Sequence, residues 1–327
     1  MYPLEFIRGV RLITDVCLDV AAGENILCIA DGEESMEILT LIAAECSAKG
    51  AEPTVVLIEP RKQHYHEPPP LVAQVMKTAD TVIVMAAGSL MHTKARKEAC
   101  EAGVKYATLG GATKESLGAL SLTKEDLLEV RRLTENVVQL LSAASSAHLT
   151  TRAGTDIRMS LKGRSGVGLV PFGKKGTFCV LPDYAEAAIA PIEDSVEGVA
   201  VIDGKMSGEP KLVGVIEEPF KITFEKGRIV NISDGKDAMR LKNLLNVIGQ
   251  EGWGFAELGV NSNDKISKRL TGTKRDDSIA GHIHIGLGRN DHIGGKLKTN
   301  THLDLLITWA TLYLDGKLIL EDGNIKM

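Results

Sequence analysis

Three histidines and a carboxylate form two short alternating segments near the end of the sequence, His282-Ile-His284 and His302-Leu-Asp304. In an extended strand, side chains at i and i+2 point to the same face. We therefore expect each segment to present a pair of metal ligands. Imidazole and carboxylate together suit zinc, cobalt, manganese or ferrous iron better than calcium or magnesium. The alternative is hydrogen-bonded polar residues on a strand pair, but two such segments so close together favour a transition-metal site.

Two carboxylates further upstream are candidates for the same site. Glu257 interrupts an apolar run, which costs free energy unless another group compensates the charge. Glu186 lies among alanines between two prolines. A metal ion would compensate either carboxylate. The alternatives are an ion pair with Arg240 or Arg269 for Glu257, and simple solvent exposure for Glu186.

The elements that would position these residues differ between the two halves of the chain. In the first half, short β-branched runs at 26–31, 54–59, 81–86 and 106–109 predict buried strands. Helical spacing separates or follows them at 34–49, 68–79, 91–102 and 124–146. Alternating strands and helices are typical of a parallel sheet, so we predict a Rossmann-like α/β domain over residues 1–148.

The second half predicts a different architecture. Glycines separate short β runs at 156–161, 198–204, 221–224 and 228–232. Helical spacing returns around 237–250 and, weakly, near 263–269. We therefore predict an α+β, mostly antiparallel domain over residues 149–327, and all of the candidate ligands lie in it.

Two other stretches do not predict sites. The turn after the first strand, at 30–35, has one glycine and two glutamates where a dinucleotide would need the G-x-G-x-x-G pattern. The histidines of 64–70 precede three consecutive prolines, which favour a rigid loop entering a helix over a metal site. We expect no nucleotide at the first stretch and no metal at the second.

The composition is that of an ordinary globular protein. The chain has 327 residues, 44% of them hydrophobic and 25% charged, and a formal charge of -5. No basic stripe indicates nucleic acid, and no apolar run approaches the roughly 20 residues of a membrane helix. The five cysteines lack C-x-x-C spacing, which fits a reducing compartment. We expect a cytoplasmic protein without nucleic-acid or membrane partners.

The order of the motifs resembles a known family. Pro-Asp-(x)2-Glu ending at Glu186 is followed by Ala-Glu-Leu at Glu257, by His-(x)2-Ile-Gly from His282, and by His302-x-Asp304. This order is similar to that of the thermophilic metallo-aminopeptidases called aminopeptidase T and S. Other segments resemble a divergent branch that includes 2,5-dihydroxypyridine dioxygenase.

The resemblance to the peptidases implies a dinuclear hydrolase. Glu186, Glu257, His282, His302 and Asp304 would hold two zinc, cobalt or manganese ions. These ions would activate a water that cleaves a peptide or small amide bond. Glu257 would bridge the ions, and Glu186 would be a terminal ligand or accept the proton of the water. His284 would be an added ligand, a hydrogen bond to substrate or support for a ligand.

One position departs from the peptidase pattern. The peptidases carry a tyrosine seven residues after the first histidine, and this chain has Arg289 there. A cation at this point would stabilise a developing oxyanion or bind a substrate carboxylate. We therefore count Arg289 among the candidate catalytic residues.

The branch with the dioxygenase implies another function. It uses a single ferrous iron held by two histidines and a carboxylate, and has a histidine where this chain has Glu257. His282 or His284 with His302 and Asp304 would still supply such a ligand set. A third possibility is a non-catalytic metal-binding protein, which the polar residues around Arg289 make less attractive. We expect a hydrolase acting on a small molecule or short peptide, and the resemblance implies a homodimer.

Overall fold

The computed structural model describes residues 4–61, 66–86, 88, 90–91, 93–109, 111–208, 214–299 and 301–326. The chain forms two compact units. The first comprises Met1–Glu129 and Val170–Tyr184, and the second comprises Val130–Leu169 and Ala185–Met327. These units differ from a single division after residue 148, because the chain returns at 170–184 to add a strand to the first sheet.

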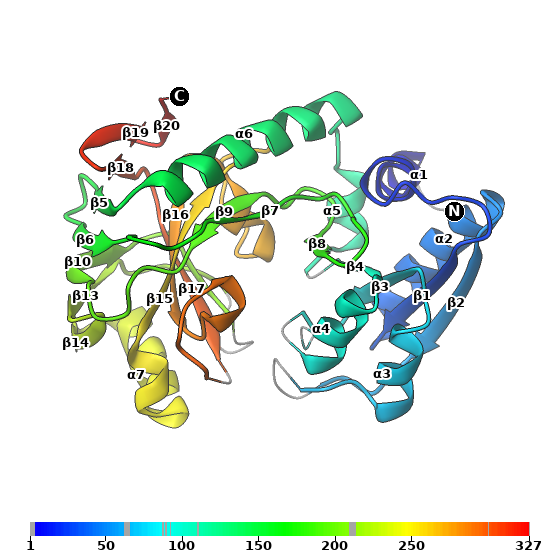
Figure 1. Ribbon diagram of the computed structural model, residues 1–327, viewed down its shortest axis with the longest axis horizontal. Helices are drawn as coiled ribbons and strands as arrows, with labels where there is room; N and C mark the ends of the chain where they lie inside the picture. The colour runs from blue at the N-terminus through cyan, green and yellow to red at the C-terminus, as the bar shows by residue number, and fades with distance from the viewer. Residues whose placement is uncertain are drawn as a thin grey trace. The chain divides into compact units, whose positions relative to one another are not determined.

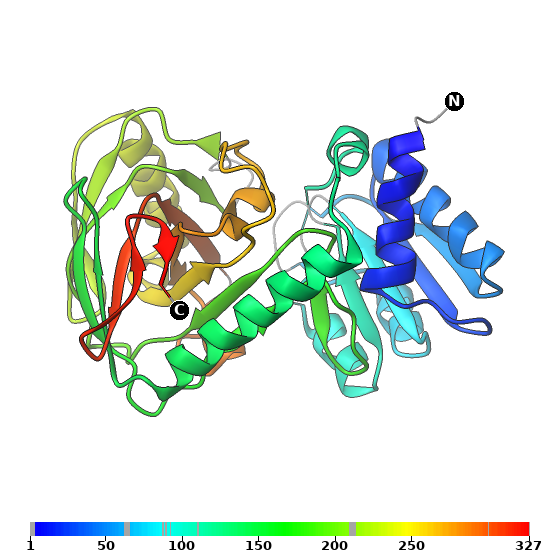
Figure 2. The same ribbon diagram turned by 90° about the horizontal axis from the view of Figure 1, so that it is seen from above.

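The first unit contains a five-stranded parallel sheet in the order β2-β1-β3-β4-β8. All four strands expected in the first half are present. β1, β3 and β4 are largely buried, as strands covered on both faces should be, whereas β2 at the edge is only partly buried. Figure 2 shows helices on both sides of this sheet. The strands are β1 (Asn25–Ala30), β2 (Glu52–Leu57), β3 (Thr81–Met85), β4 (Lys105–Thr108) and β8 (Phe178–Val180). The helices are α1 (Leu4–Arg11), the π-helix η1 (Leu12–Cys17), α2 (Glu33–Ala48), α3 (Pro70–Met76), α4 (Lys94–Glu101) and α5 (Lys114–Gly118).

The proline-rich stretch leads into α3, which begins at Pro70. Glu67 in this stretch accepts hydrogen bonds from the backbone N–H groups of Lys94 and Ala95, and so caps the start of α4. His64 lies outside the described residues. The described part of this stretch therefore supports helix starts.

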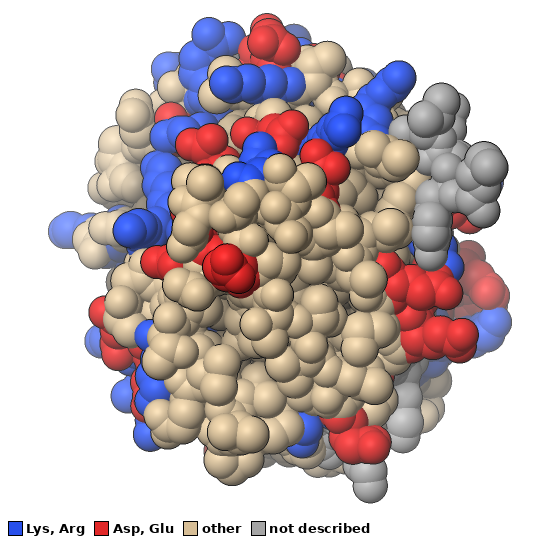
Figure 3. Space-filling view, turned by 90° about the vertical axis from the view of Figure 1, so that its right-hand side faces the viewer, with Lys and Arg blue, Asp and Glu red and all other residues tan. Residues whose placement is uncertain are grey.

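The outer strand of the first sheet, β2, exposes an apolar side chain, Leu57, to solvent. Figure 3 looks onto the side of the molecule where β2 and α2 lie in Figure 1. It shows a broad area without charged side chains, with Lys, Arg, Asp and Glu around its margin. Uncharged areas of this kind are common at protein interfaces. The homodimer stays a prediction.

The second unit contains two antiparallel sheets (Figure 1). One has the order β14-β13-β10-β6-β5-β18-β19-β20, and the other has the order β12-β11-β17-β16-β15-β9-β7. The strands of the first are β5 (Ser146–Thr150), β6 (Asp156–Ser160), β10 (Glu197–Ile202), β13 (Phe220–Glu225), β14 (Arg228–Ile232), β18 (Thr311–Leu314), β19 (Lys317–Glu321) and β20 (Asn324–Ile325). Those of the second are β7 (Val167–Leu169), β9 (Glu186–Ile189), β11 (Lys205–Ser207), β12 (Gly214–Val215), β15 (Phe255–Asn261), β16 (Ile283–Gly288) and β17 (His302–Ile307). The predicted fold class, α/β followed by mostly antiparallel α+β, is confirmed.

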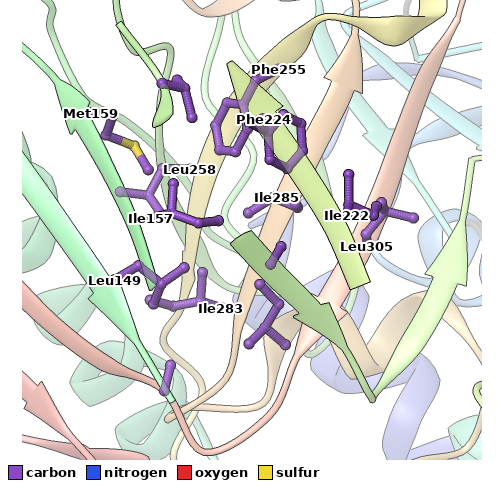
Figure 4. Close-up of a cluster of buried hydrophobic side chains, with 14 of the residues drawn as sticks. Leu149, Ile157, Met159, Ile222, Phe224, Phe255, Leu258, Ile283, Ile285 and Leu305 are labelled. Carbon is purple, nitrogen blue, oxygen red and sulfur yellow. The ribbon is translucent and has the colours of Figure 1, made fainter. Parts of the chain in front are cut away.

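A single apolar core joins the two sheets of the second unit. Ile157 comes from the sheet that contains β6, and Leu258, Ile285 and Leu305 come from the sheet that contains β15. All four belong to one buried cluster, in which Phe224 meets Phe255 edge to face (Figure 4). Burying apolar area of this kind contributes about 25 cal/mol per Å². The sheet that carries the candidate ligands is therefore held rigidly by its core face.

The helices of the second unit lie outside these sheets. They are α6 (Lys124–Ala143), which enters from the first unit, α7 (Lys236–Ile248), and the 3-10 turns η2 (Gln250–Trp253), η3 (Lys274–Ser278) and η4 (Asp291–Ile293). The weak expectation of a helix near 263–269 is wrong. Asn263 bonds through its backbone to Ser278 and Ala280 and through its side chain to the N–H of Lys265, which holds the segment in an irregular path. No helix among the described residues is long and apolar enough to cross a membrane.

Candidate metal centre

Four neighbouring strands bring the candidate ligands together. In the order β17-β16-β15-β9, Glu257 pairs with Gly286 and Gly286 with Asp304, so both acidic residues lie in one row across the sheet. Glu186 opens β9 and His302 opens β17. Side chains in such rows share a face of the sheet. Strand pairing thus assembles residues that are far apart in sequence.

His302 faces two carboxylates. Its Nε2 lies 3.2 Å from Glu257 Oε2 and 3.0 Å from Asp304 Oδ1. Its Nδ1 lies 2.7 Å from the backbone carbonyl of Arg289, which can only accept a hydrogen bond. The proton is therefore on Nδ1, and the lone pair of a neutral His302 would be on Nε2, where a metal ion could receive it.

His284 is oriented in the same way. Its Nδ1 lies 2.8 Å from Asn261 Oδ1, and the Asn261 amide is itself fixed because its Nδ2 donates to the backbone carbonyl of Asp276. Its Nε2 lies 3.3 Å from Glu186 Oε2 and 3.5 Å from Glu257 Oε1. A Cβ on Gly259 would lie 2.1 Å from the imidazole, so only glycine leaves room for this ring.

The donors form two groups that share Glu257. One group contains Glu186, Glu257 and His284, and the other contains Glu257, His292 and His302. Within each group, one nitrogen or oxygen from every residue lies within 4.8 Å of the others. His292 comes from η4, and its ring meets that of His302 edge to face at 5.3 Å.

The charges around the two histidines shift their pKa values in the direction opposite to burial. Burial lowers the pKa of His302, but the negative charges of Asp304 and Glu257 outweigh it and raise that pKa well above its ordinary value. Burial likewise lowers the pKa of His284, whereas the contact with Glu257 and the charge of Glu186 raise it to about 9. Without a metal, both side chains are therefore imidazolium cations, with a proton on each ring nitrogen, at neutral pH.

The carboxylates show the complementary effect. Burial raises the pKa of Asp304, but the charges of Lys274 and His302 lower it well below its ordinary value. Burial also raises the pKa of Glu257, which His284 and His302 lower more strongly. The site holds carboxylates beside protonated imidazoles, an arrangement in which a cation can replace protons.

Asp304 provides a test of whether these residues fit a metal ion. Its Oδ1 is buried and makes no well-aligned hydrogen bond; His302 faces it as an ion pair, with Nε2 3.0 Å away. Leaving such an oxygen unsatisfied is costly. Convergence of this atom with Nε2 of His302 and Oε2 of Glu257 matches the nitrogen and oxygen ligands that zinc, iron or manganese bind. The residues fit a divalent transition metal.

The structure separates His282 from His284. The His282 ring packs edge to face on Trp309 at 5.5 Å, and its Nδ1 accepts a hydrogen bond from the Trp309 backbone N–H. Burial and the charge of Lys268 lower the pKa of His282 to about 4. His282 is in neither donor group. The expected common direction of His282 and His284 fails because β16 begins only at Ile283, so His282 precedes the strand.

The other candidates take clear positions. Glu257 meets His284 and His302, while Arg240 pairs with Asp237. Glu186 is buried. Arg289 forms an ion pair with Asp291 at 2.5 Å, and its backbone carbonyl orients His302. Solvent exposure of Glu186 and an ion pair of Glu257 with Arg240 are therefore not the arrangements found.

Three residues of the site were not predicted as ligands or supports. They are His292, Asn261 and Lys274, whose Nζ lies 3.0 Å from Asp304 Oδ2. The polar run from Arg289 to His292 was a signal for His292, because it directly follows a strand that carries ligands. Nothing in the spacing of Asn261 or Lys274 marked them, since their partners are far away in sequence: Asn261 meets His284 across a strand pair, and Lys274 reaches Asp304 from η3.

Known proteins resemble this chain over most of its length. A 2,5-dihydroxypyridine 5,6-dioxygenase of Pseudomonas putida is 26% identical over 279 residues, which cover 78% of this chain and 73% of the relative. The structure of 2,5-dihydroxypyridine dioxygenase from P. putida KT2440 superposes with a TM-score of 0.81 at 18% identity, covering 99% of this chain and 98% of the other. Wild-type AmpT from Thermus thermophilus superposes with a TM-score of 0.72 at 17% identity, with 100% of both chains covered. The expected relationship to both proteins is confirmed for the fold.

The family comparison decides between the two branches. The family model NicX, described as 2,5-dihydroxypyridine 5,6-dioxygenase, matches residues 12–327. This match and the dioxygenase relative overturn the prediction of a metallo-aminopeptidase-like hydrolase that cleaves peptide or amide bonds. The prediction failed because the order of the candidate ligands along the chain does not by itself specify the reaction. The chain belongs to the NicX family of 2,5-dihydroxypyridine 5,6-dioxygenases.

Proposed function

We propose that this protein is a metal-dependent dioxygenase that opens the ring of a hydroxylated pyridine or a closely related hydroxylated aromatic compound. The observation that carries the proposal is the donor group of Glu257, His292 and His302, with Asp304 beside it, in a chain of this family. Two imidazoles and a carboxylate are the donor set of non-haem ferrous oxygenases.

His302, Glu257 and Asp304 would hold the ion. Their donor atoms lie close together, because His302 Nε2 is 3.2 Å from Glu257 Oε2 and 3.0 Å from Asp304 Oδ1, so one ion could be bound by all three residues. His292 would supply the second imidazole, because its pKa of about 4 leaves it neutral at pH 7. We propose one ferrous ion in place of the two zinc, cobalt or manganese ions expected from the peptidases.

A bound ferrous ion would supply the one-electron chemistry that allows oxygen to react with an organic ring. The residues of this chain would orient the site and hold protons. His284, protonated at neutral pH, keeps a proton on Nε2 between Glu186 and Glu257. Arg289 supports His302 through its backbone carbonyl, and the Arg289 guanidinium is paired with Asp291.

The test is metal content together with oxygen uptake. Protein purified from its own host should contain about one iron per chain and consume oxygen when given 2,5-dihydroxypyridine, with loss of the ring absorbance. His302→Ala should abolish both iron retention and oxygen uptake, because it removes a donor that faces two carboxylates. His282→Ala is the matched control. Two zinc or cobalt ions per chain, with no oxygen uptake on any hydroxylated ring, would contradict the proposal.

A further inference from the structure

A lysine holds the outer oxygen of Asp304. Lys274, at the start of η3, places Nζ 3.0 Å from Asp304 Oδ2 and donates a hydrogen bond to it. The other oxygen, Oδ1, is the buried atom that faces His302 Nε2. The two oxygens of one carboxylate are thus assigned to different partners.

Lys274 is itself held by a buried ion pair. Asp277 Oδ2 lies 3.5 Å from Lys274 Nζ and 2.7 Å from Lys205 Nζ. The side chains of Lys205 and Asp277 have no solvent exposure. Burying an ion pair is favourable only when further hydrogen bonds satisfy it. Lys205 Nζ also donates to the backbone carbonyl of Thr273, the residue before Lys274, so the pair fixes the start of η3.

The anchor lies on a strand next to the site. Lys205 belongs to β11, which pairs with β17 so that Ser207 lies opposite Asp304. Ser207 Oγ donates to Asp277 Oδ2 at 3.3 Å. Lys205 and Ser207 of β11 both contact Asp277, and β11 is paired with the strand that carries Asp304. The buried ion pair is therefore connected to Asp304 through two neighbouring strands.

We propose that Lys274 is a positioning residue that reserves Oδ2 of Asp304, so that a metal ion receives Oδ1 alone. The inference rests on the proposed function, because it concerns the same ion. Carboxylates bind metals through one or both oxygens. A second oxygen would take a coordination position that an oxygenase keeps open for substrate and oxygen. In this site the lysine, supported by Asp277 and Lys205, prevents that.

The experiment uses the full chain loaded with Co(II), a probe whose visible bands weaken when a further ligand makes the ion six-coordinate. Lys274→Met should bind Co(II) about threefold to tenfold more tightly, because a positive charge beside the ion is removed. Its visible bands should weaken, because Oδ2 becomes free to bind. Lys274→Arg should restore both properties. Lys265→Met is the matched control, since Lys265 is about as exposed as Lys274 and pairs with Asp264.

Weaker Co(II) binding by Lys274→Met, or tight binding with unchanged bands, would overturn the proposal. If this variant does not fold, Lys274→Gln takes its place. Glutamine keeps an N–H for Oδ2 without the charge, so tighter binding with unchanged bands is then expected and weaker binding overturns the idea. These readouts need no turnover. A protein that shows them but never consumes oxygen would refute the proposed function and leave the role of Lys274 standing.

Discussion

Glu257 and His302 meet across a strand that lies between them. Glu257 is on β15 and His302 on β17, and β16 separates these strands, yet Glu257 Oε2 and His302 Nε2 are 3.2 Å apart. Gly286 of β16 pairs with Glu257 on one side and with Asp304, two residues after His302, on the other. A Cβ at Gly286 would lie 2.7 Å from the Glu257 Cβ and 3.0 Å from the His302 ring. The contact between Glu257 and His302 therefore requires a residue without a side chain, glycine, at position 286.

Gly286→Ala should weaken metal binding by at least about tenfold, because the added methyl group pushes Glu257 and His302 apart. Substitutions of residues that contact metal ligands typically reduce metal affinity by that much. Isothermal titration with Co(II) or Fe(II) under nitrogen measures the effect. Gly118→Ala is the control, since a Cβ there meets nothing within 4 Å. Equal affinities for the two variants would show that the glycine is not required.

Two histidines with lowered pKa values, His282 and His292, should behave differently. Burial is the main cause that lowers the pKa of both His282 and His292 to about 4, so each is a neutral imidazole at pH 7. Only His292 lies with Glu257 and His302. His292→Ala should therefore reduce iron affinity by about tenfold to a hundredfold, whereas His282→Ala should leave it unchanged. Metal retained after dialysis measures both.

The reverse result, with iron lost from His282→Ala and kept by His292→Ala, would restore the ligand set expected from the motif order. Thermal unfolding without metal is the control for both variants, because each substitution also removes a packed ring.

The elements could be predicted because their signals are local. The parallel strands of the first unit follow from apolar runs such as the one that became β3, which is buried along its whole length. The helix near 263–269 failed because the side chain of Asn263 competes with helical hydrogen bonds, and spacing alone does not show this.

The site was predictable only in part. His302 and Asp304 could be identified because both lie within β17, where alternation holds. His282, which the motif order predicts as a ligand, lies outside both donor groups, because β16 begins only at Ile283. The tyrosine of the peptidases lies seven residues after their first histidine. Counted from His284 instead of His282, that position is Asp291, which is paired with Arg289. Sequence does not contain the register between strands, and that register places Asn261 beside His284.

Metal affinity should rise with pH. The pKa of His302 is raised well above its ordinary 6.5, and the imidazolium must lose its Nε2 proton before it binds an ion. Below that raised pKa, affinity should increase about tenfold per pH unit. The rise should continue above pH 6.5, where an ordinary histidine would give a plateau. Titrations with Co(II), which remains soluble at the higher pH values, measure this, and buffers of different ionisation enthalpy count the protons. A plateau near pH 6.5 would contradict the electrostatic account.

Asn261→Leu should destabilise the protein by about 2–6 kcal/mol in the free energy of unfolding, because two buried groups lose their partners at about 1–3 kcal/mol each. Those groups are His284 Nδ1 and the backbone carbonyl of Asp276. Urea unfolding of the metal-free protein measures the change. Asn231→Leu, at an exposed position of β14, should stay within about 0.5 kcal/mol of the parent. Asn261→Asp keeps an acceptor for Nδ1 but no donor for the carbonyl, so it should fall between the two. Equal stability of Asn261→Leu and Asn231→Leu would mean that Asn261 does not hold the His284 ring.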